Sequence, residues 1–299
     1  MHYGPLDATE APPLRRPSRL VLVGHPVAHS LSPTFQNAAL GAAGLGVRYE
    51  AVDVVPADLP AVLTEFRASR VAGNATVPHK AAVRSACDRL TASAHDVGAV
   101  NTFWCADDGA LVGDNTDVAG AAAAIRVVAP AIAHGAPARV ALLGAGGAAA
   151  ALIAAVRAVS PQSTLAVWAR GATRAAALAE RFGDVVAVAR TIDDALGAAD
   201  LVVNATPRGL SPADELPCPI AAIPPSAAVL DLVYGPDETA WVRAARASGL
   251  PVHDGLVMLV EQGAAAFARW FGVEPDRASM WAAVRARTGR VPPAETARW

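Results

Sequence analysis

Short apolar runs alternate with alanine-rich segments of helical length from Arg19 onward. Each run has the length of a buried strand, and the segments between the runs keep apolar residues at helical spacing. This alternation predicts βαβ units around parallel sheets, and therefore an α/β fold. The expected strands are 20–24, 49–54, 71–76, 102–105, 139–143, 164–168, 201–204 and 228–232, and the expected helices include 33–43, 57–68, 148–158, 172–182 and 238–248.

One uncharged stretch, residues 140–156, is long enough to be considered as a membrane span. It consists mostly of alanine and glycine, and Gly144, Gly146 and Gly147 cluster near its start. A strand, a glycine turn and a helix explain this composition better, so no membrane association is expected. The preceding stretch 127–138 contains prolines and glycine and is expected to be a loop.

The glycine turn after the expected strand 139–143 satisfies the pattern G-x-G-x-x-A. In a dinucleotide-binding fold the first glycine, Gly144, permits the tight turn, and the second, Gly146, lets backbone N–H groups approach a pyrophosphate. The small residue that closes the pattern allows the helix to pack closely on the strand. A glycine turn without a ligand is the alternative, because the chain is rich in glycine and alanine.

The end of the next expected strand favours NADP over NAD. An NAD-binding fold usually places a carboxylate there to hold the ribose 2′-hydroxyl. Residues 167–174 contain no carboxylate, but they carry Arg170, 26 residues after Gly144, and Arg174 one helical turn further on. Two guanidinium groups suit a 2′-phosphate, although both could instead be solvated helix residues.

The segment 204–210, N-A-T-P-R-G-L, follows another expected strand end. It is therefore expected at the carboxyl edge of the sheet, where ligands bind in open α/β folds. Pro207 and Gly209 could equally mark a turn.

Composition and charge limit the function classes. The 299 residues carry a net charge of −2 and are 53% hydrophobic and 17% charged, which indicates one large domain or two ordinary ones rather than disorder. Nucleic acid is not an expected partner, because there is no basic excess to neutralise phosphates. Cys87, Cys105 and Cys218 form no C-x-x-C pair, so neither a disulfide framework nor a zinc site is indicated, and a cytoplasmic location is expected. Residues 1–17 are interrupted by proline and lack the apolar core of a secretory signal, so they are expected to be a loose tail.

Lys80 is the only lysine among the 25 basic residues, which leaves 24 arginines. A coding bias explains the arginines but not the exception. An arginine stays protonated at any usable pH, whereas a lysine amine can release and take up a proton. A site that needs proton transfer could not accept arginine, so Lys80 is a candidate functional residue.

Polar clusters flank several expected strands in the first 120 residues. Together they offer hydroxyls, amides, carboxylates and one amine, which suits a small polyhydroxylated acid better than an apolar ligand or a metal. His25, His29 and His79 lack a carboxylate or cysteine partner at metal-ligand spacing, and the last two are expected to orient loops. Asp114 is expected to be a turn residue beside Asp117. The clusters are 24–33, 74–80, 98–102 and 113–117.

Eight motifs follow one another along the chain: H-S-L-S-P, N-A-T-V-P-H-K, G-A-V-N-T, G-D-N-T-D, G-A-G-G-A, N-A-T-P-R-G, D-L-V-Y and D-G-L-V-M-L-V-E-Q. Through these motifs residues 20–275 resemble the shikimate dehydrogenase family. The resemblance implies two α/β domains with a cleft between them: a substrate-binding domain of residues 18–117 plus 255–299, and a Rossmann-type NADP-binding domain of residues 118–254. It also implies NADPH-dependent, reversible reduction of 3-dehydroshikimate to shikimate, a step of chorismate and aromatic amino acid biosynthesis.

The same resemblance implies roles for individual residues, with Lys80 and Asp117 as the catalytic pair. When hydride adds to a carbonyl carbon, negative charge develops on the oxygen, and an ammonium group within reach stabilises it and can supply the proton. The substrate carboxylate would be held by Ser30, Ser32, Thr76 and Tyr234, and the ring hydroxyls by Asn101, Asp117 and Gln262. NADP(H) would be held by Gly144, Gly146, Gly147, Ala148, Arg170, Arg174, Thr206, Gly255 and Met258.

The chain departs from the family's pattern at several positions. Ala169-Arg170-Gly171 stands where the family often has Asn-Arg-Thr, so weaker NADP affinity is expected. Gln36 and Ala75 stand where many relatives have histidine and valine, and are expected to alter packing more than chemistry. The alternatives are an NAD-dependent quinate/shikimate dehydrogenase, an aminoshikimate dehydrogenase, and a sensor that binds the same ligand without turnover. A monomer or homodimer is expected.

Overall fold

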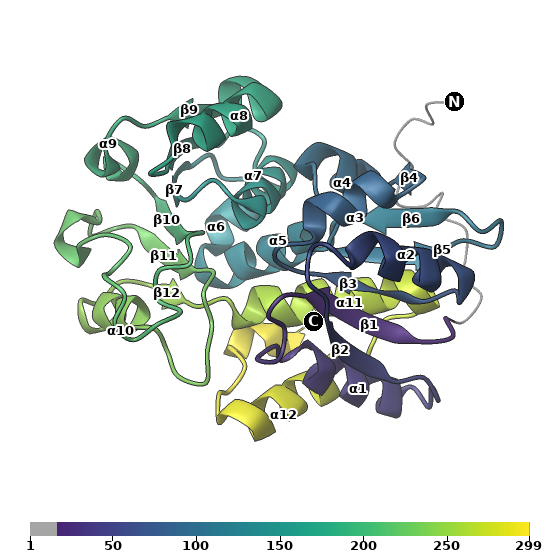
Figure 1. Ribbon diagram of the computed structural model, residues 1–299. Coiled ribbons are helices and arrows are strands. Elements are labelled where there is room, and N and C mark those ends of the chain that lie inside the picture. The colour runs from purple at the N-terminus through teal and green to yellow at the C-terminus, as the bar shows by residue number, and fades with distance from the viewer. Residues whose placement is uncertain (1–16, 299) are drawn as a thin grey trace. The chain divides into compact units, whose positions relative to one another are not determined.

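The computed structural model describes residues 17–298, which form two compact units (Figure 1). The first unit comprises the described chain up to Asp117 together with Val260–Val291, and the second comprises Val118–Leu259 and Pro292–Arg298. The loose tail expected at residues 1–17 lies, apart from Pro17, outside the described residues. Helices and strands alternate along the chain, so the expected α/β fold class is confirmed.

The first unit is built on a six-stranded sheet with the order β2-β1-β3-β5-β6-β4. Strand β1 is parallel to β2 and β3, whereas β5 is antiparallel to β3 and β6. The expectation of parallel sheets is wrong at β5, because only the short turn 106–110 joins β5 to β6, and a turn of that length reverses the chain. The strands are β1 (Leu20–Gly24), β2 (Tyr49–Asp53), β3 (Ala72–Ala75), β4 (Arg89–Leu90), β5 (Thr102–Cys105) and β6 (Leu111–Asp114).

Helices cover this sheet and bury its apolar side chains. α1 begins at Ser32 with Pro33 in its first turn, where the fixed φ of proline fits and its missing N–H is not needed. Phe66 of α2 stacks on Phe103 of β5, with ring centroids 6.2 Å apart, within the buried core. α1 and α12 lie side by side (Figure 1). The helices are α1 (Ser32–Ala42), α2 (Leu59–Ala68), α3 (Lys80–Ala86), α4 (Ala92–Val97), α12 (Arg277–Thr288) and, from Val260 onward, α11 (Leu256–Phe271).

The second unit is built on a six-stranded sheet whose pairings are all parallel. The order β12-β11-β10-β7-β8-β9 places the first strand of the unit, β7, beside the fourth, β10. This is the doubly wound order of dinucleotide-binding folds, and its switch point lies between β7 and β10. The strands are β7 (Arg139–Leu143), β8 (Thr164–Trp168), β9 (Val186–Val188), β10 (Leu201–Asn204), β11 (Ala228–Asp231) and β12 (Val252–His253).

The uncharged stretch of the second unit divides into β7, a glycine turn and α7, as expected. The loop expected at 127–138 is wrong, because α5 continues to Val128 and Pro130 opens the short helix α6, where proline fits the first turn. Across residues 17–298, no helix combines the length and the apolarity that crossing a bilayer requires. The helices are α5 (Asp117–Val128), α6 (Pro130–Ala133), α7 (Gly147–Val159), α8 (Ala172–Phe182), α9 (Ile192–Leu196) and α10 (Ala240–Ala247), with 3₁₀ helices at Gly183–Val185, Ile220–Ala222 and Ala294–Arg298.

Candidate active site

The loop between β1 and α1 carries Ser30 and Ser32. Asp53, at the end of β2, holds the start of this loop: its carboxylate lies 2.6 Å from His25 Nδ1 and accepts from Val27 N at 3.3 Å. The hydrogen bond with His25 is the main reason why the pKa of Asp53 is lowered. At the end of the loop, Ser32 N donates to Ser30 Oγ at 3.2 Å, so both serines lie in one turn at the entry to α1.

Thr76 follows β3 and lies beside the end of β1. A Cβ on Gly24 would come within 2.4 Å of Thr76 Cγ2, so a glycine is needed for the two strand ends to approach this closely. Thr76 N also donates to Val23 O at 2.9 Å. His79 is buried, and its Nε2 lies 2.6 Å from Val54 O, in agreement with the expectation that it orients a loop.

Lys80 and Asp117 form an ion pair in the first unit. Lys80 opens α3, Asp117 opens α5, and Lys80 Nζ donates to Asp117 Oδ2. The other carboxylate oxygen, Asp117 Oδ1, accepts from Asn101 Nδ2 at 2.8 Å. Asp117 is buried and Lys80 is partly buried, so solvent screens their attraction less than it would at the surface.

Asn101 links this ion pair to helix α11. Its Nδ2 also lies 3.2 Å from Oε1 of Gln262, a buried residue of α11. Its Oδ1 accepts from Thr116 N at 2.7 Å. Lys80, Asp117, Asn101 and Gln262 therefore form one hydrogen-bonded cluster, although they come from four separate segments of the chain.

Asp114 is not the turn residue that the sequence suggested. It ends β6 and is buried, and Arg269 Nε of α11 donates to its Oδ2 at 2.7 Å. Its Oδ1 accepts from the hydroxyls of Thr91 and Ser93 and from Asn115 N. A carboxylate can be buried at a strand end here because a cation and several donors compensate its charge.

Three buried polar residues, Asn74, Thr102 and Thr116, continue the cluster, and sequence reasoning assigned none of them a role. A signal was present, because each lies inside a motif: N-A-T-V-P-H-K, G-A-V-N-T or G-D-N-T-D. Polar side chains next to buried strands need hydrogen-bond partners, so their density at these places indicates a network.

In the second unit, the glycine turn and the N-A-T-P loop meet at the switch point of the sheet. Gly144 has a φ of +112°, and a Cβ there would lie 2.7 Å from Ala205 O. Ala205 N donates to Leu143 O at 2.7 Å, which continues the pairing of β10 with β7. By contrast, a Cβ on Gly146 or Gly147 would meet nothing within 4 Å, so the backbone at the start of α7 borders open space.

Arg170 and Arg174 lie beyond the end of β8, and both are exposed. Arg170 is in the link from β8 to α8, and Arg174 is in the first turn of α8, where its N–H donates to Gly171 O at 3.2 Å. Both arginines therefore follow the end of β8, the strand that pairs with β7. A doubly wound fold holds the ribose of a dinucleotide at this place.

Asp231, at the end of β11, is a buried carboxylate that the sequence reading did not single out. Its Oδ1 accepts from Asn204 Nδ2 at 2.8 Å, and its Oδ2 accepts from Thr239 Oγ1 at 2.7 Å. Burial raises the pKa of Asp231 to about 6. Asn204 in turn accepts from Thr206 N at 3.0 Å, so one side-chain network supports both the N-A-T-P loop and the D-L-V-Y segment.

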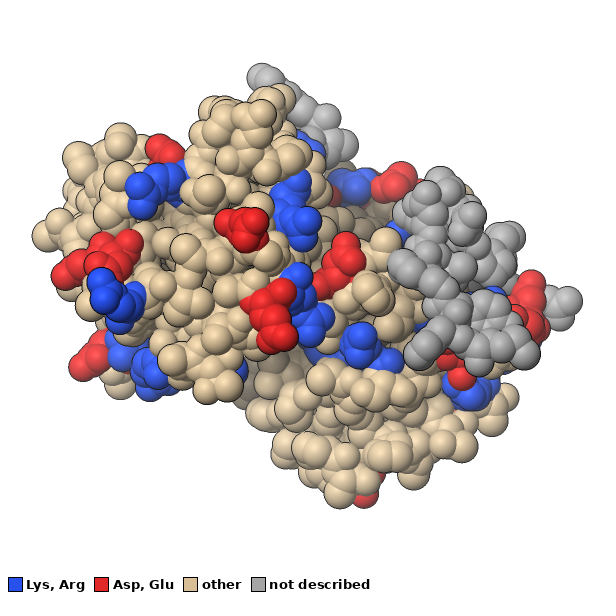
Figure 2. Space-filling model, turned by 90° about the horizontal axis from the view of Figure 1, so that it is seen from above, with Lys and Arg blue, Asp and Glu red and all other residues tan. Residues whose placement is uncertain are grey.

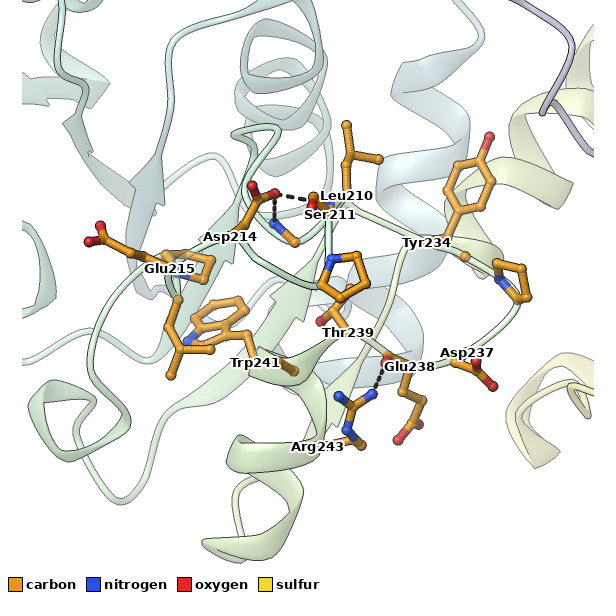
Figure 3. Close-up of a pocket in the computed structure, with 17 residues that line it drawn as sticks. Leu210, Ser211, Asp214, Glu215, Tyr234, Asp237, Glu238, Thr239, Trp241 and Arg243 are labelled. Atoms are coloured by element: carbon orange, nitrogen blue, oxygen red, sulfur yellow. Dashed lines mark hydrogen bonds between the residues drawn. The ribbon is translucent and has the colours of Figure 1, made fainter.

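Tyr234 belongs to the second unit, whereas the other residues predicted to hold the substrate belong to the first. It lines a cavity of about 290 Å³ between segment 209–217 and segment 234–243 (Figure 3). Asp214 shapes one wall by accepting from Gly209 N and Ser211 N, both at 3.0 Å. Tyr234 stands at the opposite end of the cavity from Glu215 (Figure 3).

Gly255 and Met258 lie beside the same D-L-V-Y segment. A Cβ on Gly255 would be 2.3 Å from Leu232 O, and Gly255 N donates to Val233 O at 3.3 Å. Met258 is buried in the first turn of α11. The predicted cofactor residues of the second unit therefore lie in loops and helix starts that follow β7, β8, β10 and β12.

Charged side chains of both signs are interspersed over the described part of the face drawn in Figure 2. Among residues 17–298, no three His, Cys, Asp or Glu side chains gather in a group that could hold a metal ion. The side-chain clusters described above can support hydrogen bonding, ion pairing and proton transfer.

The doubly wound parallel sheet with its glycine turn places the second unit in the class of Rossmann-type, dinucleotide-binding α/β domains. Two family models match this chain. The shikimate dehydrogenase substrate binding domain matches residues 22–103, and the shikimate 5′-dehydrogenase C-terminal domain matches residues 255–285.

Individual relatives match along most of the chain. A shikimate dehydrogenase (NADP(+)) of Methylocella silvestris is 43% identical over 261 residues, which are 86% of this chain and 91% of the relative. The structure of the Thermus thermophilus shikimate 5-dehydrogenase in complex with NADP(H) and shikimate has a TM-score of 0.79 at 41% identity, covering 90% of this chain and 98% of that one. A Corynebacterium glutamicum quinate dehydrogenase in complex with NAD has a TM-score of 0.81 at 31% identity, covering 90% and 99%. This chain belongs to the shikimate dehydrogenase family, and the resemblance drawn from its motifs is confirmed.

Proposed function

We propose that this protein is an NADP-dependent shikimate dehydrogenase that reversibly reduces 3-dehydroshikimate to shikimate in chorismate and aromatic amino acid biosynthesis. One observation carries the proposal: the Lys80–Asp117 ion pair, joined to Asn101 and Gln262, in a chain 41% identical to an enzyme whose structure holds NADP(H) and shikimate. The cluster combines a proton donor with amide and carboxylate groups that bind hydroxyls, as reduction of a polyhydroxylated ring ketone requires.

In this proposal the first unit supplies most of the groups that bind the substrate. The serine turn at Ser30 and Ser32, together with Thr76, offers hydroxyl donors to the substrate carboxylate, and Tyr234 adds a fourth. Asn101, Asp117 and Gln262 bind the ring hydroxyls. The proposed domains are residues 18–117 plus 255–299, chiefly for the substrate, and residues 118–254, chiefly for the dinucleotide; Tyr234, Gly255 and Met258 are the exceptions.

The residues of the second unit fit NADP(H). The space that a Cβ would fill at Gly146 and Gly147 is open, so a pyrophosphate can approach the N–H groups at the start of α7. The exposed guanidinium groups of Arg170 and Arg174 match a 2′-phosphate, and no carboxylate of residues 167–174 opposes it. The full proposed set is Gly144, Gly146, Gly147, Ala148, Arg170, Arg174, Thr206, Gly255 and Met258.

NADPH, when bound, supplies the hydride that reduces the substrate carbonyl. Lys80 Nζ donates a proton to the carbonyl oxygen, on which negative charge develops, and takes a proton from the hydroxyl in the reverse direction. Asp117 Oδ2 holds the ammonium group, while Asn101 holds Asp117 Oδ1. An arginine at position 80 would keep the charge but could not transfer the proton.

Quinate with NAD is the second candidate pairing, favoured by the likeness to the Corynebacterium glutamicum quinate dehydrogenase. The lower identity to that enzyme, 31% against 41%, and the two arginines after β8 favour shikimate with NADP. A cytoplasmic monomer or homodimer, with a small-molecule substrate and no nucleic-acid partner, belongs to the same proposal.

Absorbance of the reduced nicotinamide tests the proposal directly. Purified protein is assayed with shikimate and with quinate, each with NADP and with NAD. The highest kcat/KM is expected for shikimate with NADP. If quinate or NAD is preferred, the biosynthetic assignment is wrong. If no pair turns over while shikimate still binds in calorimetry, an aminoshikimate substrate is assayed next, and the protein is a sensor if that substrate is not oxidised either.

A further inference from the structure

Backbone contacts identify the oxygen and the nitrogen of two buried side-chain amides behind the catalytic pair. Asn74 faces the carbonyl oxygen of Asn101 at 3.0 Å, and because a carbonyl can only accept, the atom of Asn74 at that place is Nδ2. Asn101 faces the N–H of Thr116 at 2.7 Å, and because that group can only donate, the atom of Asn101 there is Oδ1. The remaining end of each amide is thereby assigned without reference to the side chains around it.

Tyr49 closes one end of the network. Its hydroxyl donates to Asn74 Oδ1 at 2.7 Å, the only end of that amide left to accept. Tyr49 is 1% exposed, and burial raises its pKa well above the usual value, so the phenol keeps its proton and donates it. Trp270 of α11 packs against the Tyr49 ring, with centroids 5.9 Å apart.

Thr102 is the junction between the two amides. Its Oγ1 accepts from Asn74 Nδ2 at 2.9 Å, so its own proton must go elsewhere. Two acceptors are in reach, Asn101 Oδ1 at 3.1 Å and Thr116 Oγ1 at 2.8 Å, and Thr116 Oγ1 itself donates to Asn101 Oδ1 at 3.2 Å. By either route each group donates a hydrogen bond to the next, from Tyr49 through Asn74 and Thr102 to Oδ1 of Asn101.

The series of hydrogen bonds continues from Asn101 to the ion pair of Lys80 and Asp117. With Oδ1 of Asn101 occupied by donors, Nδ2 faces Asp117 Oδ1 at 2.8 Å. Asp117 Oδ2 is then the oxygen that meets Lys80 Nζ. Thr102 is fully buried and Asn101 is 2% exposed, so water cannot substitute for a lost hydroxyl without entering the core.

We propose that Thr102 is a positioning residue for the proposed reaction: together with the N–H of Thr116, its hydroxyl holds the Asn101 amide so that Asn101 presents Nδ2 to Asp117 and leaves Asp117 Oδ2 for Lys80. Tyr49 supports it from the far end of the network through Asn74. The inference rests on the proposed function, because the reacting pair it serves is the one assigned there.

Substitutions at position 102 separate positioning from simple packing. Thr102→Val keeps the shape but removes the hydroxyl, which leaves an N–H of Asn74 without its acceptor and deprives Asn101 Oδ1 of a donor. Thr102→Ser keeps the hydroxyl and loses only a methyl group. Thr91→Val is the matched control, because Thr91 is also buried and its hydroxyl also donates to a buried side chain, the carboxylate of Asp114, which lies outside the network.

The first measurement is kcat and KM for shikimate with NADP, at a temperature well below the midpoint of thermal unfolding. Thr102→Val is expected to lower kcat about tenfold with a smaller change in KM, and Tyr49→Phe to lower it about threefold. Thr102→Ser should restore kcat to within about twofold of the unsubstituted protein. Thr91→Val should lower the unfolding temperature and leave kcat unchanged. If Thr102→Val keeps the kcat of the unsubstituted protein, or if Thr91→Val lowers kcat equally, Thr102 has only a structural role.

A second measurement does not depend on turnover. Side-chain amide hydrogen exchange of Asn101, followed by NMR, is expected to be slow in the unsubstituted protein and about tenfold faster in Thr102→Val, but not in Thr102→Ser or Thr91→Val. Equal exchange in all four proteins would overturn the positioning role. Failure of the unsubstituted protein to oxidise shikimate would instead reject the proposed function, while the exchange data would still decide whether Thr102 orients Asn101.

Discussion

The two units hold their candidate binding groups in opposite ways. In the first unit the candidate binding groups are buried side chains: Asn101, Asp117 and Gln262 are all buried and are joined by hydrogen bonds. In the second, the groups that fit a dinucleotide are the backbone of a glycine turn and exposed guanidinium groups such as Arg170. Substitutions in the first unit should therefore act mainly on kcat, and those in the second mainly on the KM of the dinucleotide.

The largest effect is expected at Lys80. Lys80→Ala removes the proton donor and leaves the Asp117 carboxylate without its cation, so kcat should fall about 1000-fold. Lys80→Arg should lose at least about 100-fold, because the charge is kept but proton transfer is not. Steady-state kinetics with shikimate and NADP measures both.

Arg67→Lys is the control for arginine–lysine exchange, because Arg67 forms an exposed pair with Asp88 at 2.6 Å. Its kcat should equal that of the unsubstituted protein. Activity of Lys80→Arg within a few-fold of the original would mean that charge alone suffices at this position, and Lys80 would then not be the proton donor.

The glycine turn offers the sharpest test of the second unit. Gly146 has a φ of −97°, and a Cβ there meets nothing, so Gly146→Ala should leave the unfolding temperature nearly unchanged. It should nevertheless raise the KM for NADP about ten- to hundredfold, because the added methyl group keeps the pyrophosphate from the backbone N–H groups.

Gly144→Ala is the structural counterpart. Its φ of +112° and the approach to Ala205 O at 2.7 Å predict a loss of about 1–3 kcal/mol in the free energy of unfolding. Chemical denaturation of both variants measures the contrast. An unchanged KM for NADP in Gly146→Ala would show that no ligand approaches this turn.

Arg170 tests the cofactor preference. Arg170→Ala should raise the KM for NADP about tenfold and leave that for NAD unchanged, because only NADP carries the 2′-phosphate. The difference in KM should shrink with added salt, since Arg170 is exposed. Arg181→Ala removes an exposed arginine from the last turn of α8 and should change neither KM. Equal losses for both cofactors would reject the 2′-phosphate role.

Local patterns predicted the elements whose ends carry local signals. β1, β5, β7, β8 and β10 begin and end where expected, because each is a mostly apolar run of strand length. β4 has only two residues and no period to detect, and β6 ends in a buried charge that no local rule allows. Its partner, Arg269, lies 155 residues away, so the compensation that permits Asp114 is invisible in the sequence.

The candidate site was predictable in its residue types but not in its contacts. A lone lysine among arginines marks Lys80 without any structure. Its bond to Asp117 spans 37 residues, and the bond from Asn101 to Gln262 spans 161, so only the fold brings them together. The orientation of the Asn101 amide depends on the N–H of Thr116 and on Thr102, which sequence reasoning did not weigh.

Asp231, a buried carboxylate of the second unit, provides the smallest effect. Its pKa is raised by burial to about 6, from an ordinary value of 3.8, so the folded protein binds this proton more tightly than the unfolded chain does. The resulting stabilisation is fully present below the unfolded pKa and is lost as the pH rises through about 6. Between about pH 7 and about pH 5, this group should add about 1 kcal/mol to the free energy of unfolding. Asp231→Asn cannot titrate, so urea denaturation at the two pH values should show a smaller increase on acidification in the variant than in the original. Equal pH dependence in the two proteins would mean that water reaches the Asp231 carboxylate and that burial does not raise its pKa. The second unit would then lack the buried, charged hydrogen-bond network that the first unit has around Asp117.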